Sequence, residues 1–94
     1  VGAMNTTIEH QPEKSRFVIA VDGEEAGRAE YFDRGSKRDF HHTVIDEKFR
    51  GNGLSSTLIT AVLDESRQAD KKVIPSCPAV SHFIDKHEEY QDLL

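Results

Sequence analysis

The spacing of apolar residues changes near the middle of the chain, and this change limits the folds that the sequence can adopt. In the first half, short runs rich in β-branched and aromatic residues alternate with polar residues, which predicts strands. Asp22-Gly23 separates two of these runs and is typical of a tight hairpin turn. The expected strands cover residues 7–10, 16–21, 25–32 and 39–45.

In the second half, the apolar residues recur at helical spacing. From Leu54 onward this spacing predicts a helix that runs to about Ala69. Residues 72–75 form a short apolar run that predicts a strand, and Pro78 suits the first position of a second helix. A strand, a helix and a strand in this order place the two strands side by side and parallel. The predicted fold class is therefore α+β, a mixed and mostly antiparallel sheet with helices layered against it.

The length of the chain limits its organisation. With 94 residues it suits one small domain and is too short for a full dinucleotide-binding fold or a TIM barrel. We expect a single domain over residues 4–94. We interpret residues 1–3, which precede Met4, as a cloning remnant.

Charge and cysteine content exclude several classes of partner. The 17 acidic and 12 basic residues give a formal net charge of −5, which argues against nucleic acid or an anionic membrane as a partner. Cys77 is the one cysteine, so the chain forms no internal disulfide, and we expect no metal site. The sequence contains neither a membrane-spanning apolar run nor a secretory signal, so we expect a cytoplasmic protein.

A glycine-containing loop separates the predicted strand over residues 39–45 from the first helix. Gly51 and Gly53 allow a tight turn and a close approach of a ligand to the backbone. The free N–H groups at the start of the helix and the helix dipole favour an anion such as a phosphate, and Lys48 and Arg50 add positive charge. The alternative is an ordinary turn that starts a helix. The loop matches neither a P-loop nor the dinucleotide fingerprint, since Leu54 follows the second glycine and the third glycine is absent.

Four segments, taken in order, resemble a known family. Arg50-Gly51-Asn52-Gly53-Leu54-Ser55 is similar to the Q/R-x-x-G-x-G/A signature of the GNAT superfamily of acetyl-CoA-dependent N-acetyltransferases. The segments 42–46, 72–78 and 87–90 resemble the His-Thr-Glu-Val, Cys-Pro and His-Pro-Glu-Tyr motifs of its small single-domain subfamily. The resemblance implies the GNAT-like fold, in which the sheet splays open beside the glycine loop.

The resemblance also implies a binding site for acetyl-CoA or CoA as cosubstrate. The loop backbone would hold the pyrophosphate, the pantetheine arm would run along the strand before the loop, and the thioester would arrive after the next strand. The residues implied for this site are Val44, Ile45, Arg50, Gly51, Asn52, Gly53, Leu54, Ser55, Ser76 and Cys77.

The chain departs from the subfamily at several positions. Ser55 replaces the usual Gly or Ala that closes the loop signature, and serine is still small. Val44 stands where the subfamily usually has a glutamate, so a carboxylate general base is missing from this strand. Ala79 replaces an aromatic residue and Glu88 replaces a proline.

Cys77 is a candidate catalytic residue. If Pro78 begins a helix, Cys77 is its N-cap, and the positive end of a helix favours a thiolate nucleophile. The thiol would then carry the acetyl group or orient the thioester. The alternative is a small apolar side chain that fills the corner between strand and helix.

Two histidines and a tyrosine are further candidates for proton transfer. Adjacent strand residues face opposite sides, so His41 should share a face with Ile45, His42 should share one with Phe40, and the two cannot bind one metal. Either histidine can accept a proton from an incoming ammonium, or it can simply form local hydrogen bonds. Tyr90 resembles the tyrosine that protonates the leaving thiolate in other family members, or it packs the last turn onto the sheet.

Three functions are compatible with the sequence. The first is an acetyl-CoA-dependent N-acetyltransferase, whose acceptor is an amine of a peptide, a protein or a polyamine. The second is a CoA- or acyl-CoA-binding module with little turnover, which the valine at position 44 supports. The third is an interaction domain that keeps the fold without the ligand. The sequence leaves the acceptor and the oligomeric state open.

Overall fold

The computed structural model describes residues 5–94, so the interpretation of residues 1–3 as a cloning remnant lies outside the described residues. The strands are β1 (Thr6–Gln11), β2 (Arg16–Val21), β3 (Glu24–Asp33), β4 (Lys37–Ile45) and β5 (Lys72–Ile74), and the α-helices are α1 (Leu54–Gln68) and α2 (Pro78–Lys86). All the predicted strands and helices are present. The structure adds three 3₁₀ helices that were not predicted, at Pro12–Lys14, Glu47–Phe49 and Glu88–Leu93.

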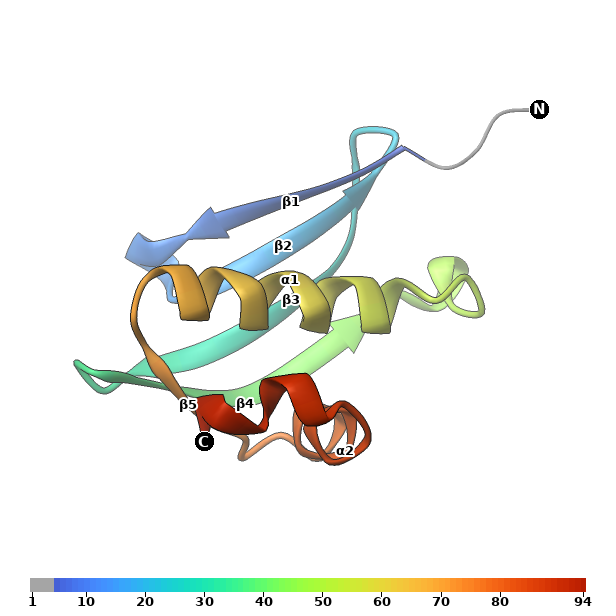
Figure 1. The fold of residues 1–94 in the computed structure, drawn as a ribbon. Coiled ribbons are helices and arrows are strands. Elements are labelled where there is room, and N and C mark those ends of the chain that lie inside the picture. Colours follow the sequence, from blue (N-terminus) through green and yellow to red (C-terminus); the bar gives the residue numbers. More distant parts are fainter. Residues whose placement is uncertain (1–4) are drawn as a thin grey trace.

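The five strands form one sheet in the order β1-β2-β3-β4-β5, antiparallel except for the parallel pair β4–β5 (Figure 1). The predicted hairpin is confirmed, because Asp22 and Gly23 both have positive φ angles between β2 and β3. The short β5 pairs only with Lys37–Asp39. The second half of β4 therefore extends beyond its parallel neighbour, which gives the predicted splay.

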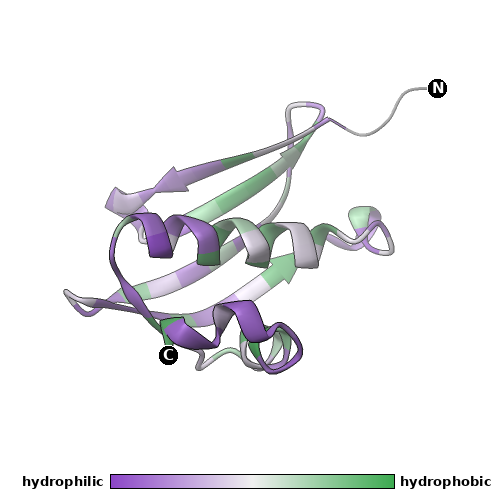
Figure 2. Cartoon of the chain, in the orientation of Figure 1, coloured by the Kyte–Doolittle hydropathy of each residue, from purple (hydrophilic) through white to green (hydrophobic). Residues whose placement is uncertain are grey.

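The helices lie on one side of the sheet. Helix α1 crosses the sheet, while α2 lies near β4 and packs against α1 (Figure 1). Apolar residues of the strands and of both helices meet in one core beneath α1, and polar residues occupy the outer turns (Figure 2). The opposite face of the sheet carries no helix of residues 5–94, and we call it the helix-free face. The largest fully buried core side chains are Phe17, Ile19, Phe40, Leu58, Val62, Leu63, Val80 and Ile84.

A β-bulge in β4 changes the direction of one histidine. Tyr31 pairs with Phe40 and Glu30 pairs with His42, so His41 is the extra residue of the bulge. Phe40 is fully buried in the core, and Thr43 contacts the buried Cys77. His41 and His42 therefore both lie between the core-facing residues Phe40 and Thr43, whereas a regular strand has one residue between two such positions. Both histidines lie on the helix-free face. The prediction that they face opposite sides, with His42 beside Phe40, is wrong because the bulge inserts a residue.

No helix in residues 5–94 has both the length and the apolar character that crossing a membrane requires.

Candidate functional site

The glycine loop leaves the start of α1 open. Gly51 and Gly53 have φ angles of 86° and 72°, in the left-handed region that favours glycine. An added Cβ at either position would meet no other atom within 4 Å. Gly53 is the N-cap of α1, no side chain caps the helix, and its first turn carries no acidic residue. The first N–H groups of α1 and its dipole are thus available to an anion.

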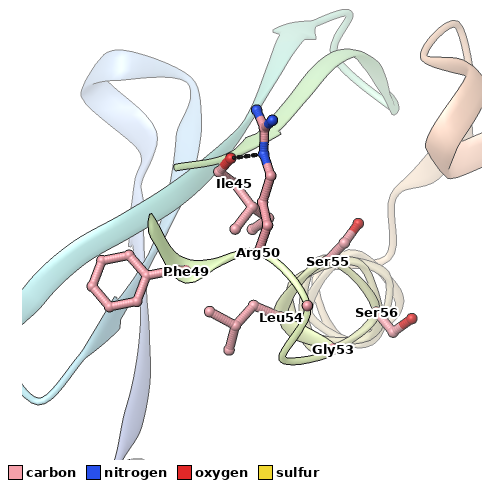
Figure 3. Close-up of a pocket in the computed structure, with 8 residues that line it drawn as sticks. Ile45, Phe49, Arg50, Gly53, Leu54, Ser55 and Ser56 are labelled. Atoms are coloured by element: carbon pink, nitrogen blue, oxygen red, sulfur yellow. Dashed lines mark hydrogen bonds between the residues drawn. The ribbon is translucent and has the colours of Figure 1, made fainter. Parts of the chain in front are cut away.

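A cavity of about 290 Å³ lies at this loop (Figure 3). Six of the ten predicted cofactor residues line it, and Phe49 and Ser56 line it as well. Ser56 follows the loop signature directly in the first helical turn, so extending the signature by one residue would have found it. The lining residues are Ile45, Phe49, Arg50, Gly51, Gly53, Leu54, Ser55 and Ser56.

The other four predicted cofactor residues do not line this cavity. Val44 lies on the helix-free face, because it pairs with Arg28 two positions after His42. Asn52 points back to the loop, where its Nδ2 donates to the Phe49 carbonyl at 2.9 Å. Ser76 is exposed between β5 and α2, next to Cys77.

The two basic residues of the loop behave differently. Arg50 lines the cavity, and its Nε donates to the Ile45 carbonyl at 3.0 Å, so the side chain extends along the end of β4 (Figure 3). Lys48 does not line the cavity, and its exposed ammonium pairs with Glu24 at 2.7 Å. Of the two charges expected to favour an anion, the one at the cavity is therefore that of Arg50.

Cys77 occupies the predicted N-cap position of α2, with Pro78 as the first helical residue. Its backbone N–H donates to the Phe40 carbonyl at 2.7 Å, just beyond the end of the β4–β5 ladder. Its Sγ lies 3.6 Å from Thr43 Oγ1, and the residue is 6% exposed. The thiol thus lies on the core side of β4, beside the opening of the sheet beyond the end of β5. Its chemical role stays a prediction.

The two histidines lie on the other face of β4. The ring of His41 stacks on Phe32 with 4.0 Å between ring centroids, and exposed His42 lies across from Glu30. Glu30 accepts from Arg28 at 2.5 Å, and this hydrogen bond lowers the pKa of the Glu30 carboxyl, with smaller contributions from the charges of Arg28 and both histidines. The structure therefore brings the histidines together but separates them from the thiol of Cys77 by the strand itself.

Tyr90 lies away from the glycine loop. Its hydroxyl donates to Asp64 Oδ1 at 2.8 Å, and Asp64 is about 15 Å along α1 from Leu54. Burial and this hydrogen bond raise the pKa of Tyr90 to about 12. These contacts favour packing of the 3₁₀ helix Glu88–Leu93 against α1, and a role in protonating a thiolate stays a prediction.

A second groove, also of about 290 Å³, continues from the cavity between α1 and α2. It shares Ser55 and Ser56 with the first cavity and was not predicted from the sequence. His87 lines it, stacked on Phe83 at 3.9 Å between centroids, with Nδ1 donating to the Phe83 carbonyl at 2.7 Å. The other lining residues are Ile59, Ala79, His82, Phe83 and Lys86.

Within residues 5–94, no three His, Cys, Asp or Glu side chains come close enough together to hold a metal ion.

The sequence of residues 16–93 matches the family model of the GCN5-related N-acetyl-transferases. This match covers most of the chain, including the loop, both α-helices and four of the five strands. The chain belongs to this family.

Solved structures agree with the family assignment. The solution structure of a GCN5-like protein from Staphylococcus aureus superposes with a TM-score of 0.70 and 26% sequence identity, covering 93% of this chain and 85% of that one. The crystal structure of Ard1 from Thermoplasma volcanium gives a TM-score of 0.61 at 21% identity, over 80% of this chain and 55% of Ard1. At that identity the second likeness shows the fold alone. No curated protein matches the chain.

Membership of the GCN5-related N-acetyl-transferases and the likeness to the Staphylococcus aureus structure confirm the expected GNAT-like fold. The glycine-loop cavity then lies where the signature residues of the family meet the start of α1.

Proposed function

We propose that the protein is an acetyl-CoA-dependent N-acetyltransferase. The observation that carries the proposal is the cavity at the uncapped start of α1, beside the half of β4 that has no parallel neighbour. Such a site offers free N–H groups for a diphosphate and a strand edge for an extended arm with amide groups. Acetyl-CoA has both chemical features.

The glycine loop binds the pyrophosphate of the cofactor, and β4 binds its pantetheine arm. The N–H groups after Gly51 and Gly53 donate to the pyrophosphate, and the left-handed backbones of the two glycines let it approach without a Cβ in the way. Arg50 adds a positive charge at the same cavity. The pantetheine arm extends along β4 toward Cys77, which borders the splay.

The chemistry is attack of an amine on the thioester. The acceptor nitrogen forms a bond to the acetyl carbonyl carbon, the C–S bond breaks, and CoA leaves as a thiolate that takes up a proton. His41 and His42 lie on the helix-free face, where an acceptor can reach them, and either can remove the proton from the ammonium. Cys77 either orients the thioester or carries the acetyl group before the amine receives it.

Two glycines with similar left-handed φ angles, 72° at Gly53 and 77° at Gly35, provide the test of the cofactor site. Gly53→Ala places a Cβ in the left-handed region at the cavity, and Gly35→Ala does the same in the β3–β4 turn. Each change should lower the free energy of unfolding by about 1–2 kcal/mol. In calorimetric titration with acetyl-CoA, the dissociation constant should rise at least tenfold for Gly53→Ala and should not change for Gly35→Ala. Equal affinity in the two variants would refute this placement of the pyrophosphate.

One observation favours a second candidate, a CoA-binding module with little turnover. Val44 presents no carboxylate to the helix-free face where a glutamate base is usual in the small subfamily. Mass spectrometry after incubation with acetyl-CoA and a panel of amines separates the two functions. Binding without any acetylated amine would favour the module. Full transfer activity of Cys77→Ala would assign the thiol a packing role.

A further inference from the structure

Resting on the proposed function, we propose that the acceptor is a primary ammonium on an alkyl arm, such as a lysine side chain, and that it binds on the helix-free face. Its ammonium contacts the Asp39 carboxylate, and its arm lies along the ring of Phe32.

Asp39 carries an unpartnered carboxylate oxygen. Its side chain is 15% exposed, and its Oδ1 is the one buried side-chain nitrogen or oxygen atom in residues 5–94 without a hydrogen-bond partner. An unpaired buried acceptor of this kind is costly, so a donor that reaches it gains a strong, charge-assisted hydrogen bond. Among the carboxylates near the histidines, Glu30 is already paired with Arg28. The free acceptor is therefore that of Asp39.

The side chain of Arg34 occupies the position proposed for the cationic end of the acceptor. The Arg34 guanidinium lies over the Phe32 ring, 5.0 Å from its centroid, and its Nη2 is 3.9 Å from Asp39 Oδ2. That distance is too long for a hydrogen bond. Because the Arg34 side chain is 57% exposed and such surface pairs are weak, an incoming ammonium can displace it. The carboxylate and the aromatic face then recognise the cation and its apolar arm together.

This position is next to the expected place of the thioester. Asp39 pairs with Ile74 in the last step of the β4–β5 ladder, and the next hydrogen bond joins the Cys77 N–H to the Phe40 carbonyl. The splay begins there. The cofactor cavity includes Ile45, which faces the core, so an acceptor that approaches from the helix-free face meets the acyl group from the opposite side.

His41 can remove the proton from the bound ammonium. It lies two residues after Asp39 on the same face, about 7 Å away along the strand, and stacks on Phe32. The ammonium passes one proton to the imidazole, and the neutral nitrogen attacks the thioester carbonyl. The C–N bond forms, the C–S bond breaks, and the second nitrogen proton goes to the CoA thiolate. The imidazolium returns its proton to water, so one proton is released for each acetyl group transferred.

Steady-state acetylation with two acceptors tests the recognition of the cation. Nα-acetyl-lysine amide has a charged ε-ammonium at neutral pH, whereas aniline is uncharged there. Asp39→Asn should raise the KM for the lysine compound about tenfold with kcat within twofold, and should leave the KM for aniline unchanged. Glu9→Gln makes the same charge change on the same face, three strands away on β1, and should alter neither KM. Equal effects of Asp39→Asn on both acceptors, or none, would overturn the proposal.

A binding measurement tests the same site without turnover. In a titration of ¹⁵N-labelled protein with n-butylammonium chloride, the amide shifts of Phe32, Asp39 and His41 should move, and Asp39→Asn should abolish these changes. Shifts that persist in Asp39→Asn, or that occur only elsewhere, would overturn the site. Calorimetry with acetyl-CoA on the same samples distinguishes an error in the proposed function from an error in the acceptor site. If the proposed function is wrong, the wild-type protein will not bind acetyl-CoA. If only the acceptor site is wrong, the wild-type protein will still bind acetyl-CoA.

Discussion

The two ends of helix α1 differ in how their polar groups are used. At the first end, Gly53 provides no side-chain cap, and the first N–H groups face a cavity of about 290 Å³. At the other end, the buried Arg38 of β4 donates to Glu65 and, at 3.1 Å, to Ser66 Oγ. The Ser66 hydroxyl in turn donates to the Val62 carbonyl at 2.7 Å.

The network at the second end reaches the edge strand β1. His10 Nε2 lies 2.7 Å from the Tyr31 hydroxyl, and the His10 ring stacks on Phe17 with 4.1 Å between centroids. His10 Nδ1 faces Glu65 at 3.5 Å. Polar groups that satisfy one another hold the helix on the sheet, whereas polar groups left without partners at the loop are available to a ligand. Changes at one end should therefore affect stability, and changes at the other should affect binding.

Arg38→Met should have the largest effect on stability. The substitution keeps an apolar side chain near Phe17 and Tyr31 but removes the hydrogen bonds to Glu65 and Ser66. We expect the free energy of unfolding in urea to fall by about 2–3 kcal/mol. The dissociation constant for acetyl-CoA should stay within twofold. A parallel loss of affinity would show that the two ends are coupled.

Arg50→Ala should change binding with little change in stability. The guanidinium is the basic group at the cavity, so its loss should weaken acetyl-CoA binding roughly tenfold by calorimetry. The bond from Arg50 Nε to the Ile45 carbonyl allows the opposite outcome, because that carbonyl lies at the end of β4 beside the proposed path of the pantetheine. Tighter binding in the variant would show that Arg50 blocks the strand and does not hold the phosphate.

Tyr90→Phe should cost about 1 kcal/mol in the free energy of unfolding, because it removes the hydrogen bond to Asp64. The transfer rate should change less than twofold if Tyr90 only packs the C-terminal segment against α1. Steady-state kinetics and urea unfolding on the same preparation measure both quantities. A tenfold or larger drop in kcat at unchanged KM would instead support the predicted proton transfer to the thiolate.

His10 should produce the smallest effect, a dependence of stability on pH. Burial lowers the pKa of His10 below its ordinary value of 6.5, although the charge of Glu65 partly offsets this effect. The unfolded chain then binds a proton more readily than the folded one, so stability should fall as the pH drops from 6.5 through the lowered pKa and should level off above 6.5. Urea unfolding between pH 5 and 7.5 measures the slope, which His10→Gln should reduce. An unchanged slope in this variant would assign the dependence to other groups.

Local sequence patterns were sufficient for most of the fold. Alternation and helical spacing predicted all five strands and both α-helices, and Asp22-Gly23 predicted the hairpin. The loop signature contains five of the eight residues that line the cavity. These features depend on neighbours within a few residues along the chain, which is the range over which such patterns act.

The positions of the histidines could not be predicted from alternation, because a single extra residue moves every following side chain to the other face. The bulge at His41 depends on how β3 and β4 pair. The partners of Arg38 and Tyr90 lie 26 to 28 residues away on α1, and no local pattern indicates them.

The sequence by itself determined the order of the elements, the left-handed glycines at the start of α1 and the N-cap position of Cys77, because each follows from the conformations that short segments prefer. Only the tertiary structure decided which groups meet. It placed both histidines opposite the thiol, satisfied Arg38 inside the core, and left the Asp39 oxygen without a partner beside the splay. Strand register and the packing of α1 on the sheet set these contacts, and both depend on residues far apart in the chain.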